Sequence, residues 1–343
     1  MKKWISLLLS VLFLLSCAAC GAKEEPPNVE PPKDEEPALL NPLPGLPLHD
    51  PDAVSRRPVA VMLNNIHVAM PQHGVSTADM IFEYNVESEI TRMIGFYQEI
   101  EKAGIIGSVR SARPYFVDTA LGMDAIYVHA GGSTEAYNMM YNLDMDDIDE
   151  PDFDCFWRDE ERAQTMDFEH TLMTSGQRLA DYTKANGWRL EHKEGYTYPV
   201  TFVEDGTPKN GTPATDIAVT FSGYKTGTFT YDPDTKLYRI GQYDAPYIDG
   251  NTAKQVGVTN VLVLRTSVTY SGDSKGHMDI VTTGSGEGTF FCGGKAVDME
   301  WHKEAQDDPF TFTLPDGSDL PLGAGRTYVC VVDNSAPVSV SGE

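Results

Sequence analysis

The stretch Arg57-Pro58-Val59-Ala60-Val61-Met62-Leu63-Asn64-Asn65 places an unbroken apolar run between a proline and two amides. A short apolar run of this kind is typical of a β-strand that is buried on both faces. Such strands belong to layered folds in which a sheet is covered on each side. The stretch therefore predicts that the first folded domain opens here.

Strands and helices alternate after this point. Strand-like runs occupy residues 80–86, 92–97 and 125–130, and helical stretches occupy residues 114–123, 134–142 and 175–186. Pro114 suits a first helical turn, and Gly187 suits the end of a helix. The alternation predicts an α/β (or α+β) N-terminal domain over residues 50–196.

The texture changes from residue 197 onward, where Thr, Gly, Tyr and Val dominate. Short strands are predicted at residues 219–221, 228–231, 238–240, 260–264, 277–281, 288–292 and 327–332. Turn signals such as Asp232-Pro233-Asp234-Thr235 separate them, and the glycines of residues 284–288 suggest a bulge or a bend. We expect a smaller, mainly antiparallel β C-terminal domain at residues 197–334, and a tail at residues 335–343.

The N-terminus predicts export. Lys2 and Lys3 precede an apolar run at residues 4–15, and Ser16-Cys17-Ala18-Ala19-Cys20-Gly21 follows. A charged start, a short apolar core and small residues at a cleavage site are typical of a signal peptide, and the run is shorter than the roughly 20 residues of a membrane span. Cysteine at the cut indicates a lipoprotein signal at residues 1–20, with the lipid on Cys20 or Cys17. An unlipidated export signal and an uncleaved anchor are the alternatives.

A proline-rich and acidic segment at residues 21–48 is predicted to be a disordered tether, because it holds too little apolar surface to fold. These features together place the protein on the extracytoplasmic face of the cell membrane, held by its lipid. The formal net charge of −25 argues against nucleic acid as a partner, since phosphate binding needs clustered Lys and Arg.

The remaining cysteines are Cys155, Cys292 and Cys330, too few and too scattered for a disulfide framework or a zinc site. A bridge between Cys292 and Cys330 and two buried thiols are both open. An acidic run at residues 144–154 lacks the glycine and the final Glu of a helix-loop-helix calcium loop and is predicted to be solvated. We expect no metal and no cofactor.

Polar residues gather near the predicted strand ends, where open α/β sheets bind ligands. Arg110 and Arg113 stand just before a helix and suit a carboxylate or phosphate, and Gly131-Gly132-Ser133 opens the next helix. The ligand-binding candidates are Asn64, Arg92, Arg110, Arg113, Tyr115, His129, Gly131, Gly132 and Ser133. In the alternative, the two arginines pair with Glu83, Glu87 or Asp118, and His129 is a hydrogen-bonded core residue.

Two motifs carry a family resemblance: Gly107-Ser108-Val109-Arg110-Ser111-Ala112-Arg113-Pro114 and His129-Ala130-Gly131-Gly132-Ser133. With Tyr231-Asp232-Pro233 and Gly325-Arg326-Thr327-Tyr328 in the second half, the chain resembles the YerB-like lipoproteins of Gram-positive bacteria over about residues 50–333. The resemblance implies an exported, membrane-tethered protein of two domains with no established activity, and it assigns no catalytic residue.

The hypothesis that follows is a binding or accessory lipoprotein of the cell envelope. Its cleft, lined by Arg92, Arg110, Arg113, Tyr115 and His129, would take an anionic envelope ligand or a cell-wall assembly protein. A rival hypothesis is an envelope hydrolase or transferase with Glu83 or Glu87 as acid or base. A third is an interaction scaffold without a pocket. The sequence leans toward binding rather than catalysis.

Overall fold

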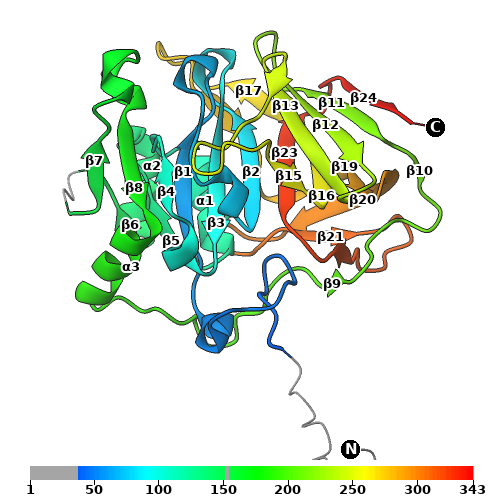
Figure 1. Ribbon diagram of the computed structural model, residues 1–343, viewed down its shortest axis with the longest axis horizontal. Coiled ribbons are helices and arrows are strands. Elements are labelled where there is room, and N and C mark those ends of the chain that lie inside the picture. Colours follow the sequence, from blue (N-terminus) through cyan, green and yellow to red (C-terminus); the bar gives the residue numbers. More distant parts are fainter. Residues whose placement is uncertain (1–37, 151–153, 343) are drawn as a thin grey trace, which may run out of the picture. The chain divides into compact units, whose positions relative to one another are not determined.

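A computed structural model describes residues 38–150 and 154–342 (Figure 1). The predicted signal at residues 1–20, with Cys17 and Cys20, and tether residues 21–37 lie outside the described residues. Leu39–Glu343 form one compact unit.

The α-helices are α1 (Pro114–Gly122), α2 (Thr134–Asn142) and α3 (Gly176–Ala185). The 3-10 helices are η1 (Pro51–Ser55), η2 (His67–Ala69), η3 (Val75–Thr77), η4 (Glu87–Glu89), η5 (Ile100–Lys102), η6 (Arg162–Gln164) and η7 (Phe168–His170). The strands of the first half are β1 (Val59–Asn64), β2 (Met80–Asn85), β3 (Thr91–Tyr97), β4 (Ile105–Gly107), β5 (Ile126–Val128), β6 (Asp147–Ile148), β7 (Phe156–Arg158) and β8 (Leu172–Ser175). Those of the second half are β9 (Phe202–Val203), β10 (Thr212–Pro213), β11 (Asp216–Thr220), β12 (Thr226–Asp232), β13 (Leu237–Gln242), β14 (Ala245–Pro246), β15 (Gly257–Val258), β16 (Asn260–Thr266), β17 (Val268–Tyr270), β18 (Met278–Ile280), β19 (Gly284–Cys292), β20 (Lys295–Lys303), β21 (Thr311–Thr313), β22 (Leu322–Gly323), β23 (Thr327–Asp333) and β24 (Val338–Ser341).

One sheet of 11 strands runs through both halves in the order β10-β20-β19-β16-β23-β2-β3-β1-β5-β6, with β21 beside β20. The first half contributes a mixed sheet with helices and the second half mainly antiparallel strands, which confirms the predicted fold class. The halves join where β2 pairs in parallel with β23, so that Met80 faces Thr327 and Tyr84 faces Val331. The backbone hydrogen bonds of this sheet therefore continue from one predicted domain into the other.

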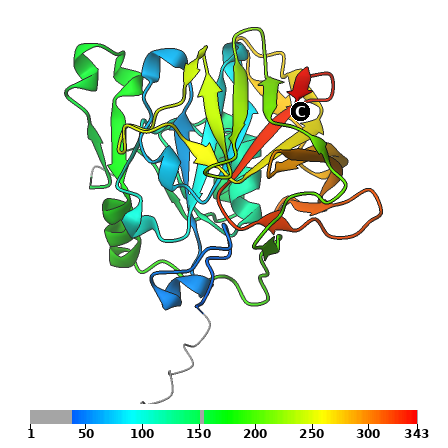
Figure 2. The same ribbon diagram turned by 45° about the vertical axis from the view of Figure 1, so that its right-hand side comes forward.

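Two apolar cores lie on the two faces of this sheet. In β1, Val59, Val61 and Leu63 belong to one core and Ala60 and Met62 to the other, as expected for side chains that alternate along a strand. The first core also includes residues of a second sheet, β14-β13-β12-β11-β24. Figure 2 shows this second sheet packed against one face of the 11-stranded sheet. The second core lies beneath α1 and α2. The prediction that β1 is buried throughout is confirmed.

Local chemistry explains the three helices. The hydroxyls of Ser133 and Ser175 accept hydrogen bonds from Ala136 N (3.2 Å) and Arg178 N (3.4 Å), capping α2 and α3. Pro114 occupies the first turn of α1, where no amide hydrogen is needed. These helices agree with their predicted ranges to within about a residue. No helix in the described part of the chain is long and apolar enough to cross a bilayer.

Three local predictions were wrong. The glycines of residues 284–288 lie in strand β19, which pairs with β20 without a bulge, although Gly284 at its first position has a φ of +108°. Strand β19 packs closely on Trp301, and a Cβ at Gly286 would lie 2.5 Å from the Nε1 of that residue. The predicted tail contains β24, which pairs with β11. The last part of the predicted tether, residues 39–48, folds onto the body and buries Leu43 completely.

The alternatives for Cys292 and Cys330 are resolved. Both are buried thiols without a bridge, and they belong to the cores on opposite faces of the sheet. Strand β16 also lies between their two strands, which separates the two thiols further. No disulfide joins β19 to β23.

A buried carboxylate lies beside the β2–β23 junction. Glu83 accepts hydrogen bonds from Asn65 Nδ2 (2.6 Å), Thr91 Oγ1 (2.5 Å) and Tyr328 OH (2.7 Å). Lys225 Nζ lies 3.3 Å from Glu83 Oε1, and each side chain is only 1% exposed. These partners come from both halves of the chain, so the Glu83 carboxylate links the two halves through polar contacts within the core.

Replacing Lys225 with Met should destabilise the fold by about 3–5 kcal/mol, because it leaves the Glu83 charge buried without a cation. The double variant Glu83→Gln/Lys225→Met should recover much of this loss, because no uncompensated charge is left. The measurement is equilibrium denaturation, with Lys209→Met at an exposed lysine as the matched control. Equal stability of the Lys225→Met and Lys209→Met variants would contradict the role of the pair.

Candidate functional site

Four arginines converge on one cavity of about 350 Å³, which we call the arginine cavity. Its lining residues are Glu87, Arg92, Val109, Arg110, Ser111, Arg113, Ala130, Glu150, Arg158, Phe168, Glu169 and Leu172. Three of them, Arg92, Arg110 and Arg113, were candidates from the sequence. The structure brings these three together although β3 and the segment before α1 are separate in the chain.

Backbone hydrogen bonds between the two signature motifs position the arginine segment. Ala130 N donates to Arg110 O (3.0 Å), Ala112 N donates to Gly131 O (2.9 Å), and Ser133 N donates to Ala112 O (3.2 Å). Gly131 has a φ of +71°, a conformation that glycine adopts without strain. The backbone of the His-Ala-Gly-Gly-Ser motif therefore fixes the position of the Arg-Ser-Ala-Arg-Pro segment.

Glu87 holds the inner part of the cavity. Its carboxylate accepts from Arg113 Nε (3.2 Å) and Nη2 (2.8 Å), and it also pairs with Arg92 Nη2. The side chains of Arg92 and Arg113 are 2% and 8% exposed. Partial burial raises the pKa of Glu87, but the two guanidinium charges outweigh it and bring the pKa below its ordinary value.

The outer part is more open. Arg110 Nη2 lies 3.1 Å from Glu169 Oε2, and Glu169 is 59% exposed. Arg158 pairs with Glu150, and its guanidinium lies 3.8 Å from the centre of the Phe168 ring. A surface carboxylate such as Glu169 binds its partner weakly and can be replaced by another anion.

The arginine cavity has a surplus of positive charge, because four guanidinium groups face three carboxylates. In addition, Nε of Arg92 and Nε of Arg110 are buried and have no hydrogen-bond partner among the described residues. A buried donor without an acceptor destabilises the folded state. The cavity is thus a basic site within a strongly acidic chain.

The predicted cleft was wrong about Tyr115 and His129, neither of which lines the cavity. Tyr115 lies in the first turn of α1 and is buried, and its hydroxyl donates to Asn85 O (3.0 Å). The His129 ring lies between Asp147 Oδ2 (3.1 Å from Nε2) and Gly131 O (2.9 Å from Nδ1). His129 is thus a core histidine that orients the loop after β5, as the alternative stated.

The other candidates also support the segment from outside the cavity. Asn64 Nδ2 donates to Ser108 Oγ (3.2 Å), and Ser133 caps α2. Gly132 pairs with Ala112 in an isolated bridge. Glu83, a catalytic candidate, lies in the core rather than at the cavity, because its partners bury it. Ligand binding by Asn64, Gly132 and Ser133 stays a prediction.

Sequence reasoning missed the outer wall of the cavity. Arg158, Phe168 and Glu169 come from β7 and η7, far along the chain from the signature motifs. Glu150 was noted only as part of the acidic run. Three carboxylates of that run pair with protein groups: Asp146 with Arg57, Asp147 with His129, and Glu150 with Arg158. Asp144 and Asp154 are exposed, so the expectation of a solvated loop holds for them but misses the three ion pairs.

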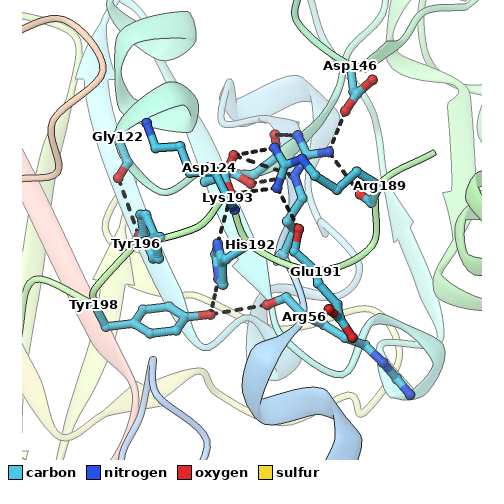
Figure 3. Close-up of polar contacts among 12 residues, drawn as sticks. Arg56, Gly122, Asp124, Asp146, Arg189, Glu191, His192, Lys193, Tyr196 and Tyr198 are labelled. Atoms are coloured by element: carbon cyan, nitrogen blue, oxygen red, sulfur yellow. Dashed lines mark hydrogen bonds and ion pairs between the residues drawn. The ribbon is translucent and has the colours of Figure 1, made fainter.

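A second polar cluster surrounds Asp124 and fixes the segment that leads from α3 to the second half (Figure 3). Asp124 accepts from Arg189 Nη2 (2.7 Å) and Lys193 N (2.9 Å), and its Oδ2 lies 3.1 Å from His192 Nδ1. His192 Nε2 lies 2.7 Å from Tyr198 OH, which in turn bonds to Gln98 (3.0 Å).

Partial burial raises the pKa of Asp124, but hydrogen bonds from His192, Arg189 and Lys193 N outweigh it and hold the pKa well below its ordinary value. The Asp-His-Tyr chain looks like a catalytic relay. Tyr198, however, is directed at Gln98 and Arg56 O rather than at an opening. We therefore assign this cluster a structural role, and no sequence motif marked it.

Replacing Glu87 with Gln should cost about 2–4 kcal/mol of unfolding free energy at pH 7, since two buried guanidinium groups lose their shared carboxylate. The pKa of Glu87 is lower in the folded state than its ordinary 4.5. Its contribution is therefore complete above pH 4.5 and is lost as the pH falls through the folded-state value.

The gap between wild type and Glu87→Gln should thus be widest near neutrality and narrow in acid, as measured by denaturant titrations at several pH values. Glu89→Gln, at an exposed residue of the same turn, is the control. A gap that does not change with pH would count against the ion pairs.

Comparison with known proteins places the whole body in one family. Residues 43–189 match the family model described as "Protein of unknown function (DUF3048) N-terminal domain", and residues 217–329 match the DUF3048 C-terminal domain. "Putative lipoprotein YerB" of Bacillus subtilis (strain 168) is 30% identical over 349 aligned residues, covering 99% of this chain and 98% of the relative. The crystal structure of the B. subtilis YerB protein matches with a TM-score of 0.75 and 28% identity, over 88% of this chain and 99% of that one. The resemblance read from the two signature motifs is confirmed: this chain belongs to the DUF3048 family, together with YerB.

Proposed function

We propose that this protein is a lipid-anchored component of the cell envelope, on the extracytoplasmic face, that binds an anionic group in the arginine cavity. The anchoring is supported by the N-terminal motif and by a relative that is named a lipoprotein. The binding is supported by one observation above all: the guanidinium groups of four arginines line one cavity and outnumber its three carboxylates.

The ligand would enter from the outer side. Glu169 is the most exposed of the three carboxylates, so a carboxylate or phosphate of the ligand would take its place on Arg110. Arg92 and Arg113 would supply a fixed positive field from behind, because Glu87 and the core hold them in place. Guanidinium groups suit this task, since their donors match the geometry of carboxylate and phosphate oxygens.

Catalysis by Glu87 fits the geometry less well. A general acid or base works best when its pKa lies near the operating pH, whereas the pKa of Glu87 is lowered by its two arginines. Its oxygens are also occupied by those arginines. Glu87 therefore suits the role of a holder for the two cations.

A protein partner at the same face is the second candidate, favoured by one observation. The Phe168 ring is 72% exposed at the mouth of the cavity, and aromatic side chains beside arginine are typical of interface centres. If a partner docks here, Phe168→Ser should abolish its crosslinking in membranes, and phosphate should not bind to the isolated protein.

The test of anion binding is calorimetric titration of the folded protein with inorganic phosphate at low salt. Arg110→Ala should weaken binding by about tenfold or more, because it removes a charge-assisted pair. Glu169→Gln should strengthen binding, because it removes the competing carboxylate. These opposite signs would not result from a general loss of structure.

Arg239→Ala is the matched control, since Arg239 also pairs with one carboxylate, Asp232, at 3.2 Å. It should leave phosphate binding unchanged. Binding should weaken as salt is added. Failure of wild type to bind phosphate, or weaker binding by Glu169→Gln, would refute the assignment.

A further inference from the structure

A second cavity, of about 970 Å³, lies between the two halves, and we call it the junction cavity. The first half contributes parts of residues 41–49, 76–79 and 97–103, and the second half contributes parts of residues 204–207, 231–237 and 323–326, with other residues. It is larger than the arginine cavity and shares no residue with it. Cavities with a few converging polar groups at such junctions are typical ligand sites.

Arg326 provides a cation on which the carboxylates of Asp79 and Asp249 act only from a distance. One of its guanidinium nitrogens donates to Gly257 O (2.9 Å). Among the described residues, no carboxylate forms an ion pair with it. A largely buried guanidinium is costly unless it is paired, so a carboxylate from a ligand would find a ready partner here.

Asp79 lies in the same lining and is already oriented. Its Oδ1 accepts from Asn41 Nδ2 (3.2 Å) and its Oδ2 from Gln98 N (2.8 Å). Burial raises the pKa of Asp79 to about 6, although these hydrogen bonds oppose the shift. Near neutrality the carboxyl is thus able both to accept and, once protonated, to donate a hydrogen bond.

The remaining lining is mostly polar and can form hydrogen bonds with a ligand rich in hydroxyl groups. It includes the carboxylates of Glu99, Glu204 and Asp205 and the ammonium groups of Lys102 and Lys236. Ser76 and Thr259 bring hydroxyls, and Tyr231 brings an aromatic ring. Glycines let two backbone segments come together at the wall, since a Cβ at Gly206 would lie 2.2 Å from Gly323 N. Backbone at a cavity wall offers further donors and acceptors for hydroxyls.

We propose that the junction cavity binds a saccharide that carries a carboxylate. The guanidinium of Arg326 pairs with that carboxylate, while Asp79 and the hydroxyl side chains bind the hydroxyls of the sugar ring. The apolar face of the ring packs on Tyr231. This site is separate from the arginine cavity, so the inference does not depend on anion binding there.

Two sugars test the proposal: N-acetylglucosamine, and N-acetylmuramic acid, which differs from it by a lactyl ether on O3 that carries a carboxylate. Each is titrated into the folded protein up to about 10 mM and followed by calorimetry, a range that detects millimolar affinity. We expect N-acetylmuramic acid to bind at least about tenfold more tightly, which corresponds to one charge-assisted pair. Arg326→Ala should abolish that preference without changing the affinity for N-acetylglucosamine.

Two further variants separate the alternatives. Leu46→Trp, at an exposed residue of the wall, should fill the cavity and weaken both sugars without disturbing the core. It keeps the proposal testable if Arg326→Ala fails to fold. Arg110→Ala reports on the arginine cavity. If Arg110→Ala loses sugar binding and Arg326→Ala keeps it, the sugar binds in the arginine cavity and the proposal is overturned. Equal affinity for the two sugars, or no saturation with either, would also overturn it.

Discussion

The buried carboxylate of Glu83 is the constraint on which the rest of the structure depends. A charge in the core is tolerated only when hydrogen bonds and a counter-charge surround it, and here Asn65, Thr91, Lys225 and Tyr328 provide them. These residues come from segments that are far apart in the chain. Satisfying one carboxylate therefore fixes the register of β2 against β23, and with it the single sheet through both halves.

The arginine cavity depends on that sheet through backbone contacts rather than through side chains alone. The His-Ala-Gly-Gly-Ser loop follows β5, and its amides and carbonyls hold the Arg-Ser-Ala-Arg-Pro segment in place. Glu87 then ties Arg113 to Arg92 on β3. Backbone hydrogen bonds and a shared carboxylate thus hold the guanidinium groups in place before binding, which reduces the entropy lost on binding. The two signature motifs therefore contain residues that hold the cavity in shape as well as arginines that line it.

Most of the first half was predictable because its signals are local. The apolar run of β1, the serine caps of α2 and α3, and Pro114 in α1 each act within a few residues. The glycines of β19 were wrongly predicted to form a bend, because the reason for them is distant in the chain: the ring of Trp301 on the neighbouring strand occupies the space that a side chain would need. Strand β24 was missed because its pairing with β11 spans most of the second half. At the site, Arg92, Arg110 and Arg113 were found, but their neighbours Arg158 and Phe168 were not.

The sequence by itself determined most of the order of strands and helices and the identity of the arginines beside a helix start, and it predicts an export signal. These follow from composition, periodicity and capping, which operate along the chain. Only the tertiary structure decided which side chains face a cavity and which are buried. It assigned His129 and Tyr115 to the core, paired the arginines with glutamates, and placed the Arg326 guanidinium against Gly257 O. The reason is physical: burial and Coulomb interaction depend on distance in space, and the folding of one sheet through both halves sets those distances.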